Sequence, residues 1–354
     1  MGRRASVETG ASASERPHAS TLPPPNVVEL AREIVGGRDG DARLVAHERL
    51  KRLVHRLRFE LPGGADSVVV KRLAPRLARA NQLVAERWLP AVGLDWACPR
   101  LRGALHDPAA SASWHVYEDV HGDRLDNRAP DPDRIALVVE LLAQVHARFA
   151  AHGLLAECRR DGAELGIGFF SSEVRRSICF LGAIETAELP RERVALRNSL
   201  LARMKRLYGE RHERALQLER FGGPDTLLHG DLWTTNMLLT EGSKGLRATL
   251  IDWDHVGVGP VSYDVSTFLS RFLPNHRRWI LGMYRDAAEG TGSRLPGDAK
   301  LNLLFETAEC ARYASCLAEA ALAASHGERW GFEQLAEIEN WFGELEPILP
   351  ATGP

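Results

Sequence analysis

One short stretch of the chain gathers polar side chains around a predicted β-hairpin. Residues 228–239 read Leu-His-Gly-Asp-Leu-Trp-Thr-Thr-Asn-Met-Leu-Leu, and residues 250–254 read Leu-Ile-Asp-Trp-Asp. Apolar runs on both sides of the glycine-containing segment 241–245 predict two antiparallel strands and a turn. The side chains with chemical potential are His229, Asp231, Asn236, Asp252 and Asp254.

The predicted hairpin places Asn236 roughly opposite Asp252, with Asp231 in the loop that leads into it. Opposed residues of antiparallel strands lie about 4.5–5.5 Å apart, so two oxygen-bearing side chains converge. Such oxygens suit Mg²⁺, which takes a few protein ligands and substrate phosphates. Phosphoryl transfer needs this metal, a residue that orients the acceptor hydroxyl and a positive charge on the phosphates. The stretch therefore predicts phosphoryl transfer.

The order of these residues matches a known catalytic loop. Protein kinases carry His-x-Asp-x-x-x-x-Asn followed by a second Asp about one hairpin later, and His229, Asp231, Asn236 and Asp252 keep that order. Gly at 230 replaces the kinase Arg, and Trp-Asp at 253–254 replaces Phe-Gly. In this form the chain resembles the aminoglycoside phosphotransferase and choline-kinase-like family, over roughly residues 30–345.

The resemblance implies an α+β fold, the bilobal protein-kinase-like fold. A small mixed N-terminal lobe with an antiparallel sheet would be followed by a larger, mainly helical C-terminal lobe. It implies ATP, or alternatively GTP, and Mg²⁺ as cofactors. Asp231 would orient the acceptor hydroxyl, while Asn236 and Asp252 would hold Mg²⁺. His229 would be the first residue of the catalytic loop and would brace the backbone rather than do chemistry.

Two further carboxylates are expected to support this loop. Asp264 matches a family position whose carboxylate accepts backbone N–H bonds from the catalytic loop. Its sequence context, Asp-x-x-Thr, equally permits N-capping of a helix. For Asp254 two roles stand side by side, namely binding a second metal through water or capping a neighbouring turn.

The nucleotide-binding residues are expected in the N-terminal part. Ser67-Val-Val-Val-Lys71 is a β-branched strand, and the resemblance implies that Lys71 contacts the α- and β-phosphates. A helix is predicted over residues 76–92, and its Glu86 would pair with Lys71. Glu60 is a less well placed rival for that pairing.

Residues 114–122 read Trp-His-Val-Tyr-Glu-Asp-Val-His-Gly. They resemble the family's hinge between lobes, where backbone groups near Glu118 and Val120 would pair with adenine. An edge strand followed by a turn is the alternative.

The chain departs from kinases where the glycine-rich phosphate loop should be. Residues 43–57 contain no glycine, whereas a kinase loop reads Gly-x-Gly-x-x-Gly. Arg49, Lys51 and Arg52 could supply charge in place of close backbone contact. A solvated basic strand face is the alternative that the sequence favours.

Composition is that of a soluble globular protein. The 354 residues are 44% hydrophobic and 26% charged, with net charge −2. We expect no nucleic-acid partner, because no basic face is concentrated, and no membrane span, because no apolar run is long enough. Five scattered cysteines without a Cys-x-x-Cys pair favour a reduced, cytoplasmic setting. The oligomeric state is left open.

We expect the chain to divide into three parts: a disordered tail over 1–25, a nucleotide-binding lobe over 26–120 and a catalytic and substrate-binding lobe over 121–350. The leading function is an ATP- and Mg²⁺-dependent kinase of a small-molecule hydroxyl, such as an aminoglycoside antibiotic, an amino alcohol or a sugar. One alternative is a catalytically silent kinase-like binding protein. The other is a metal-dependent hydrolase using His229, Asp231, Asp252, Asp254 and His255.

Overall fold

A computed structural model describes residues 22–37, 41–108, 111–242 and 245–349. Contacts between these residues group into two units. The first, here called the mixed unit, comprises the described residues of 18–164 and 224–295. The second, here called the helical unit, comprises residues 165–223 and those described after residue 295. Each unit is described by itself.

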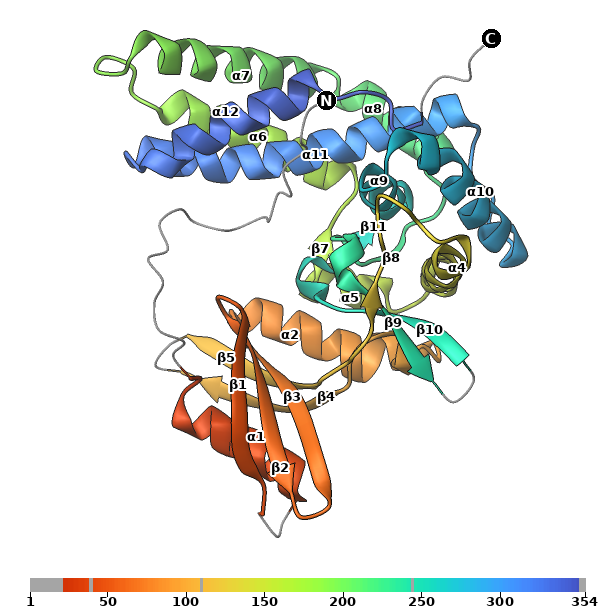
Figure 1. Cartoon of the computed structure of the whole chain (residues 1–354). Helices are drawn as coiled ribbons and strands as arrows, with labels where there is room; N and C mark the ends of the chain where they lie inside the picture. The colour runs from red at the N-terminus through yellow and green to blue at the C-terminus, as the bar shows by residue number, and fades with distance from the viewer. Residues whose placement is uncertain (1–21, 38–40, 109–110, 243–244, 350–354) are drawn as a thin grey trace. The chain divides into compact units, whose positions relative to one another are not determined.

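A five-stranded antiparallel sheet forms the N-terminal part of the mixed unit (Figure 1). Its strand order is β1-β2-β3-β5-β4, so only the last two strands are out of chain order. Alternating or β-branched apolar residues form these strands, as expected for a sheet with two different faces. The strands are β1 (Arg43–Lys51), β2 (Val54–Leu61), β3 (Gly64–Leu73), β4 (Leu101–Asp107) and β5 (Ala112–Glu118).

Helix α1 (Pro25–Gly36) covers one face of this sheet, where Phe59, Val70 and Val116 are fully buried with Val27 and Ala31 of the helix. Residues directly opposite on neighbouring strands share a face. Lys51 opposes Val54, Val54 opposes Lys71, and Lys71 opposes His115. This row therefore lies on the other face of the sheet, and it brings two lysines to that face.

A helical run follows β3. It consists of α2 (Pro75–Leu83), a π-helical turn (Val84–Trp88), α3 (Leu89–Ala91) and a short 3₁₀ turn (Asp95–Ala97). The helix predicted over 76–92 is therefore present, but one of its turns is wider than an α-helical turn.

The hairpin predicted from the polar stretch is present as β9 (Met237–Gly242) and β10 (Gly245–Leu250). Residues 243–244 of its turn lie outside the described residues. Met237 opposes Leu250, and the N–H of Ile251 donates to the carbonyl of Asn236 at 2.9 Å. Asn236 thus faces Ile251, one residue before Asp252.

Short elements surround this hairpin. Strand β6 (Asp123–Arg124) pairs with β9, and β7 (Ala163–Glu164), β11 (Gly257–Gly259) and β8 (Thr226–Leu228) form a small sheet. One 3₁₀ turn, Thr234–Asn236, comes directly before the β9–β10 hairpin, and another, Trp253–His255, follows it. The helices of the mixed unit beyond the sheet are α4 (Pro132–Phe149), α5 (Leu155–Asp161), α9 (Ser262–Ser270) and α10 (Pro274–Gly290).

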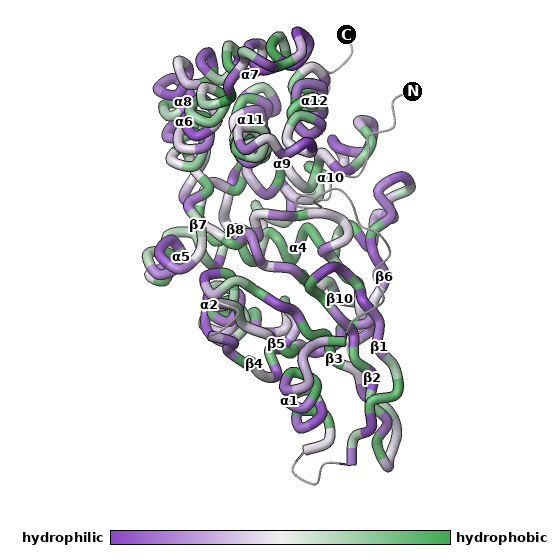
Figure 2. The backbone as a smooth tube through the Cα atoms, turned by 90° about the vertical axis from the view of Figure 1, so that its left-hand side faces the viewer, coloured by the Kyte–Doolittle hydropathy of each residue, from purple (hydrophilic) through white to green (hydrophobic). Residues whose placement is uncertain are grey.

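The described residues of the helical unit form only helices: α6 (Ile167–Ala183), α7 (Arg191–Gly209), α8 (Arg211–Phe221), α11 (Asp298–Ser325) and α12 (Arg329–Gly343). Figure 2 shows hydrophilic and hydrophobic residues alternating along α7 and α12. On α7 the buried residues Leu200, Met204 and Leu207 recur at helical spacing. The buried Ser177 hydroxyl donates to the Ala314 carbonyl at 2.7 Å and joins α6 to α11.

The predicted fold class is confirmed, with an antiparallel N-terminal sheet and a larger, mainly helical remainder. The predicted division after residue 120 stays a prediction, and residues 1–21 of the predicted tail lie outside the described residues. Among the helices described, none combines the length and the apolar character that a membrane crossing requires.

Close packing of α11 and α12 makes a specific stability prediction. A Cβ at Gly331 would lie 2.5 Å from the Ala324 nitrogen and 2.7 Å from the Ala320 carbonyl oxygen. We expect Gly331→Ala to lower the free energy of unfolding by about 1–3 kcal/mol through overpacking. Gly343→Ala, on the same helix with no atom within 4 Å of its Cβ, is the matched control. Chemical denaturation of both variants checks this, and equal stability would contradict the packing argument.

Candidate active site

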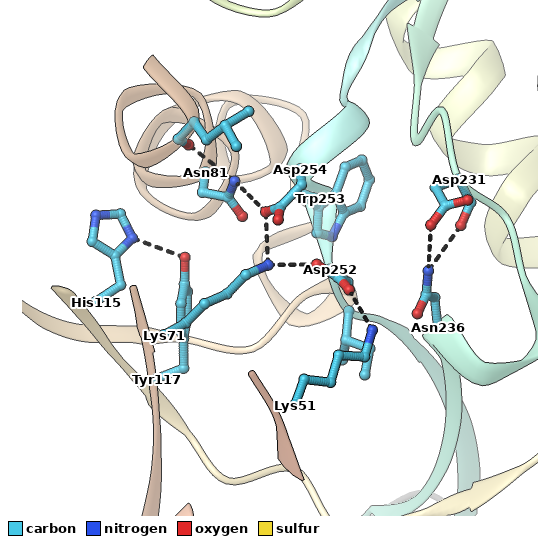
Figure 3. Close-up of polar contacts among 12 residues, drawn as sticks. Lys51, Lys71, Asn81, His115, Tyr117, Asp231, Asn236, Asp252, Trp253 and Asp254 are labelled. Carbon is cyan, nitrogen blue, oxygen red and sulfur yellow. Dashed lines mark hydrogen bonds and ion pairs between the residues drawn. The ribbon is translucent and has the colours of Figure 1, made fainter. Parts of the chain in front are cut away.

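A cluster of two carboxylates and two ammonium groups joins the sheet to the end of the hairpin (Figure 3). The Lys71 ammonium donates to Asp252 and, at 2.7 Å, to Oδ1 of Asp254. Lys51, at the end of β1, reaches Oδ2 of Asp252 at 3.1 Å. The cluster lies within the mixed unit and brings together the predicted phosphate-binding lysine and the predicted metal ligand.

The charges of this cluster stabilise one another. Burial lowers the pKa of Lys71, but the Asp252 and Asp254 carboxylates raise it by more, so its pKa is raised. Burial raises the pKa of Asp252, whereas the Lys71 and Lys51 ammonium groups lower it, and the net shift is downward. Both net shifts favour the charged forms, so Lys71 and Asp252 are charged at neutral pH.

Asp252 has a left-handed backbone conformation, with φ 66° and ψ 59°. Residues other than glycine rarely adopt this backbone conformation, and Asp and Asn do so more easily than most. The conformation ends β10 abruptly and starts the 3₁₀ turn that carries Asp254. Both carboxylates thereby reach the same lysine, although only one residue separates them.

Asn81 holds the second carboxylate in place, and the sequence did not single it out. Its amide nitrogen donates to Asp254 Oδ1 at 3.0 Å and to the Leu77 carbonyl at 3.0 Å. The side chain is buried on α2. The partners of Asp254 in the structure are Lys71 and Asn81, and its expected role toward a second metal stays a prediction.

The structure does not bring Glu86 to Lys71. The Glu86 carboxylate accepts instead from Gln82 Nε2 at 2.8 Å, in an exposed position. Asn81 already occupies the helix face directed at the cluster. Glu86 lies five residues later, about 1.4 α-helical turns, and within the π-helical turn, so its side chain leaves the helix in another direction. The rival, Glu60, pairs with Arg43.

Asp231 and Asn236 form the second polar group of the site. The Asn236 amide nitrogen donates to the Asp231 carbonyl at 3.0 Å and to its carboxylate Oδ2 at 3.1 Å. Figure 3 shows the Asn236 oxygen turned away from Asp231, on the side where Lys51 and Asp252 are drawn. The pair fixes the direction of the Asp231 carboxylate.

His229 braces two backbone segments. Its Nε2 lies 2.9 Å from the Ile251 carbonyl oxygen. Because a carbonyl can only accept, Nε2 carries the proton, and Nδ1 accepts from the Asp231 N–H at 3.3 Å. The Trp253 ring packs against the imidazole with a centroid distance of 4.6 Å. His229 thus links the loop of Asp231 to the strand end before Asp252.

Asp264 also holds the loop that carries Asp231, through hydrogen bonds to its backbone. Its carboxylate accepts from the backbone N–H groups of His229 at 2.8 Å and Gly230 at 2.9 Å. It lies within the first turn of α9 rather than at its N-cap, so the capping alternative does not describe its contacts. Buried His146 supports it, with Nε2 at 3.4 Å from Asp264 and Nδ1 at 2.7 Å from the Tyr284 hydroxyl.

Gly230 explains one departure from protein kinases. Its φ is +80°, and a Cβ there would lie 2.0 Å from the His255 carbonyl oxygen. A side chain at this position is therefore excluded by backbone atoms, which cannot move aside as a flexible side chain can.

The predicted hinge follows β5. Glu118 is the last residue of that strand, its N–H donates to the Arg100 carbonyl at 3.0 Å, and Val120 lies in the irregular segment beyond. Between them Asp119, with a side chain only 1% exposed, accepts from Arg56 Nε at 2.8 Å and Ser67 Oγ at 2.7 Å. This buried carboxylate anchors the segment to β2 and β3. The backbone contacts with adenine stay a prediction.

His115 and Tyr117 line the sheet beside Lys71. His115 Nδ1 lies 2.9 Å from the Tyr117 hydroxyl. Burial and, to a lesser extent, the Lys71 charge lower the pKa of His115 to about 4. Burial and nearby carboxylates raise the pKa of Tyr117. Both side chains are neutral at pH 7, so they add no competing charge to the cluster.

The site provides oxygen atoms that could bind a metal ion and ammonium groups that could bind phosphate. The Asp252 carboxylate and the Asn236 amide oxygen are hard donors of the kind that Mg²⁺ prefers. Within the part of the chain that the structure describes, no group of three or more His, Cys, Asp or Glu side chains is placed to hold a metal. The hydrolase alternative, which requires such a group, gains no support from this geometry.

Neutral, buried His115 makes stability depend on pH. The folded pKa is about 4 and the ordinary value is 6.5. As pH falls from 6.5 to 4 the unfolded chain takes up a proton that the folded chain does not, so the free energy of unfolding falls, by up to about 3 kcal/mol. His115→Gln should remove this part of the loss. Melting temperatures measured as a function of pH test this prediction. His106→Gln, at an exposed position of β4, is the control. Equal pH profiles for wild type and His115→Gln would contradict the role of His115.

Solved structures from several organisms have a similar fold. An aminoglycoside phosphotransferase from Alicyclobacillus acidocaldarius is 16% identical, with a TM-score of 0.52 over 93% of this chain and 98% of that one. The choline kinase LicA from Streptococcus pneumoniae is 14% identical (TM-score 0.51, 86% and 95% covered). The macrolide 2′-phosphotransferase MphH from Brachybacterium faecium is 19% identical (TM-score 0.53, 86% and 96% covered). At these identities the likeness concerns the fold.

Comparison with curated proteins finds no match. The sequence model described as the phosphotransferase enzyme family matches residues 31–304. The matched range contains the lysine–carboxylate cluster, the Asp231 loop and Asp264, and it spans more than half of the chain. The chain belongs to the phosphotransferase enzyme family, as its catalytic-loop sequence predicted.

Proposed function

We propose that the protein transfers the γ-phosphoryl group of ATP, with Mg²⁺, to a hydroxyl of a small molecule. The observation that carries the proposal is the arrangement within the mixed unit, where Lys71 meets Asp252 and Asp231 meets Asn236. Phosphoryl transfer has a loose transition state, so catalysis consists mainly of positioning and charge stabilisation. The site offers both functions without a nucleophilic side chain.

Lys71 is proposed to contact the nucleotide phosphates. Its side chain is only 12% exposed. The Asp252 and Asp254 carboxylates hold its ammonium group in one place. A fixed positive charge at low solvent exposure interacts more strongly with phosphate than a solvated one. Asp254 and Asn81 would orient Lys71, in place of the expected pairing of Lys71 with Glu86.

Asn236 and Asp252 are proposed to hold Mg²⁺. The observation that supports this is the Asp252 carboxylate, whose two oxygens already take two cationic groups. The Asn236 oxygen is turned away from Asp231, because the amide nitrogen donates there. When bound, the metal would neutralise charge on the β- and γ-phosphates.

Asp231 is proposed to orient the acceptor hydroxyl. The Asn236 amide fixes the direction of the carboxylate, and His229 and Asp264 fix the backbone at and just before Asp231. A carboxylate held in this way can accept the hydroxyl proton as the phosphoryl group leaves the nucleotide.

Related structures indicate the range of ligands. LicA has been solved with AMP, and a spectinomycin phosphotransferase has been solved with ADP and spectinomycin. These proteins and the ethanolamine kinase of Plasmodium vivax are named for antibiotics or amino alcohols. By analogy we propose an adenine nucleotide as donor and a hydroxylated antibiotic, amino alcohol or sugar as acceptor. Release of ADP across a panel of these compounds would identify the acceptor.

Asp231→Asn tests the assignment once an acceptor is found. We expect kcat to fall by about 10²–10⁴-fold, because the proton acceptor is lost, while the Kd for ATP changes less than about three-fold. The matched control is Asp225→Asn, in the same segment, whose exposed carboxylate pairs with Arg159 and should contribute little. Coupled ADP detection and calorimetric titration give the two readouts. Unchanged turnover in Asp231→Asn would refute the role.

A further inference from the structure

The β1–β2 turn brings a second lysine to the cluster. Strand β1 ends at Lys51, which opposes Val54 across the two-residue turn, and Val54 in turn opposes Lys71. Opposed residues share a face of the sheet, so both lysines extend from the same face. The carbonyl of Leu53, within the turn, accepts from the Arg72 N–H at 2.9 Å. The turn is thereby tied to β3 beside Lys71.

Lys51 has the properties of a movable charge. Its side chain is 62% exposed, in contrast to 12% for Lys71, and its ammonium group lies 3.1 Å from Asp252 Oδ2. An ammonium on a flexible four-carbon stem can change partner while its backbone stays in place. The backbone of Lys51 is held by the strand pairing and by the turn.

Binding of a metal would remove the partner that Lys51 has here. Asp252 is the proposed metal ligand, and a doubly charged cation on this carboxylate repels an ammonium group a few ångströms away. The same metal carries phosphate oxygens with it, and these are negatively charged. The nearest new partners for Lys51 are therefore the outer phosphates of the nucleotide.

We propose that Lys51 is a phosphate-binding residue that rests on Asp252 and transfers to the outer phosphates when the metal and nucleotide bind. The inference rests on the proposed function. It assigns to a charged side chain the contact that a glycine-rich loop makes with its backbone amides, and β1 and β2 contain no glycine. The solvated-face interpretation that the sequence favoured for this turn does not account for the contact with Asp252.

Titration of purified full-length Lys51→Gln with AMP, ADP and ATP tests the proposal. With Mg²⁺ we expect the Kd for ATP to rise about 5- to 30-fold, the effect of one lost charge-assisted hydrogen bond at a partly exposed site. The Kd for AMP, which has no outer phosphates, should stay within two-fold. Lys51→Arg should restore most of the ATP affinity, because it returns the charge.

Arg49→Gln is the matched control. Arg49 lies on the same strand and opposes His55, which opposes Val70 on the face that packs against α1. Arg49→Gln removes one positive charge from the opposite face of the sheet, so it should leave the Kd values for AMP, ADP and ATP within two-fold of wild type. Melting temperatures of both variants verify that they fold.

The outcomes separate the two proposals. Wild-type protein that binds none of the three nucleotides would refute the proposed function and this inference with it. Wild type that binds ATP, with Lys51→Gln equal to it, would refute the inference alone, as would a loss of affinity that is the same for AMP and ATP. The transfer itself requires the ATP effect to be larger in Mg²⁺ than in EDTA, and equal effects would refute it.

Discussion

The contact of Lys71 with Asp252 and Asp254 is the interaction on which the site depends. It joins residues about half the chain apart in sequence, one at the end of a strand in the N-terminal sheet and the others just after the β9–β10 hairpin. Removing one charged partner from a poorly solvated cluster leaves the others without compensation, at a large cost in stability. The sheet and the hairpin are therefore held in a fixed relation by the same charges that would bind phosphate and metal.

A second network, made of hydrogen bonds to the backbone, holds the Asp231 loop. Asp264 takes two N–H groups of the loop, His229 takes one and donates to the strand end, and His146 and Tyr284 support Asp264 from the core. Buried polar groups are costly unless they are paired, so this network has one arrangement in which every member is used. Its rigidity suits a reaction in which positioning does most of the work.

The sequence predicted which polar residues lie together where a short stretch of chain determines it. His229, Asp231, Asn236 and Asp252 flank one hairpin, and a local pattern therefore places them. Asp264 follows at a short fixed distance. Lys71 was recognisable because β-branched residues mark the end of its strand. The fold class followed from the family resemblance that this motif carries.

The sequence did not predict contacts that depend on helix phase or on distant elements. Glu86 was expected because the family pairs a helix Glu with this lysine, yet the helix face directed at the cluster carries Asn81. The anchoring of Asp119 by Arg56 and Ser67 joins three elements with no shared local pattern. Lys51 was one of three basic residues that could supply charge, and the cross-strand row and the contact with Asp252 distinguish it from the other two.

The π-helical turn at Val84–Trp88 has a consequence for the helix that carries Asn81. In a regular α-helix, residues seven apart lie on nearly the same face, so residues 81 and 88 would point in one direction. In this chain Asn81 contacts Asp254, whereas Trp88 is fully buried and donates to Glu157 of α5. The wide turn acts as a phase shift of one inserted residue, so the side chains before and after it point to different neighbours.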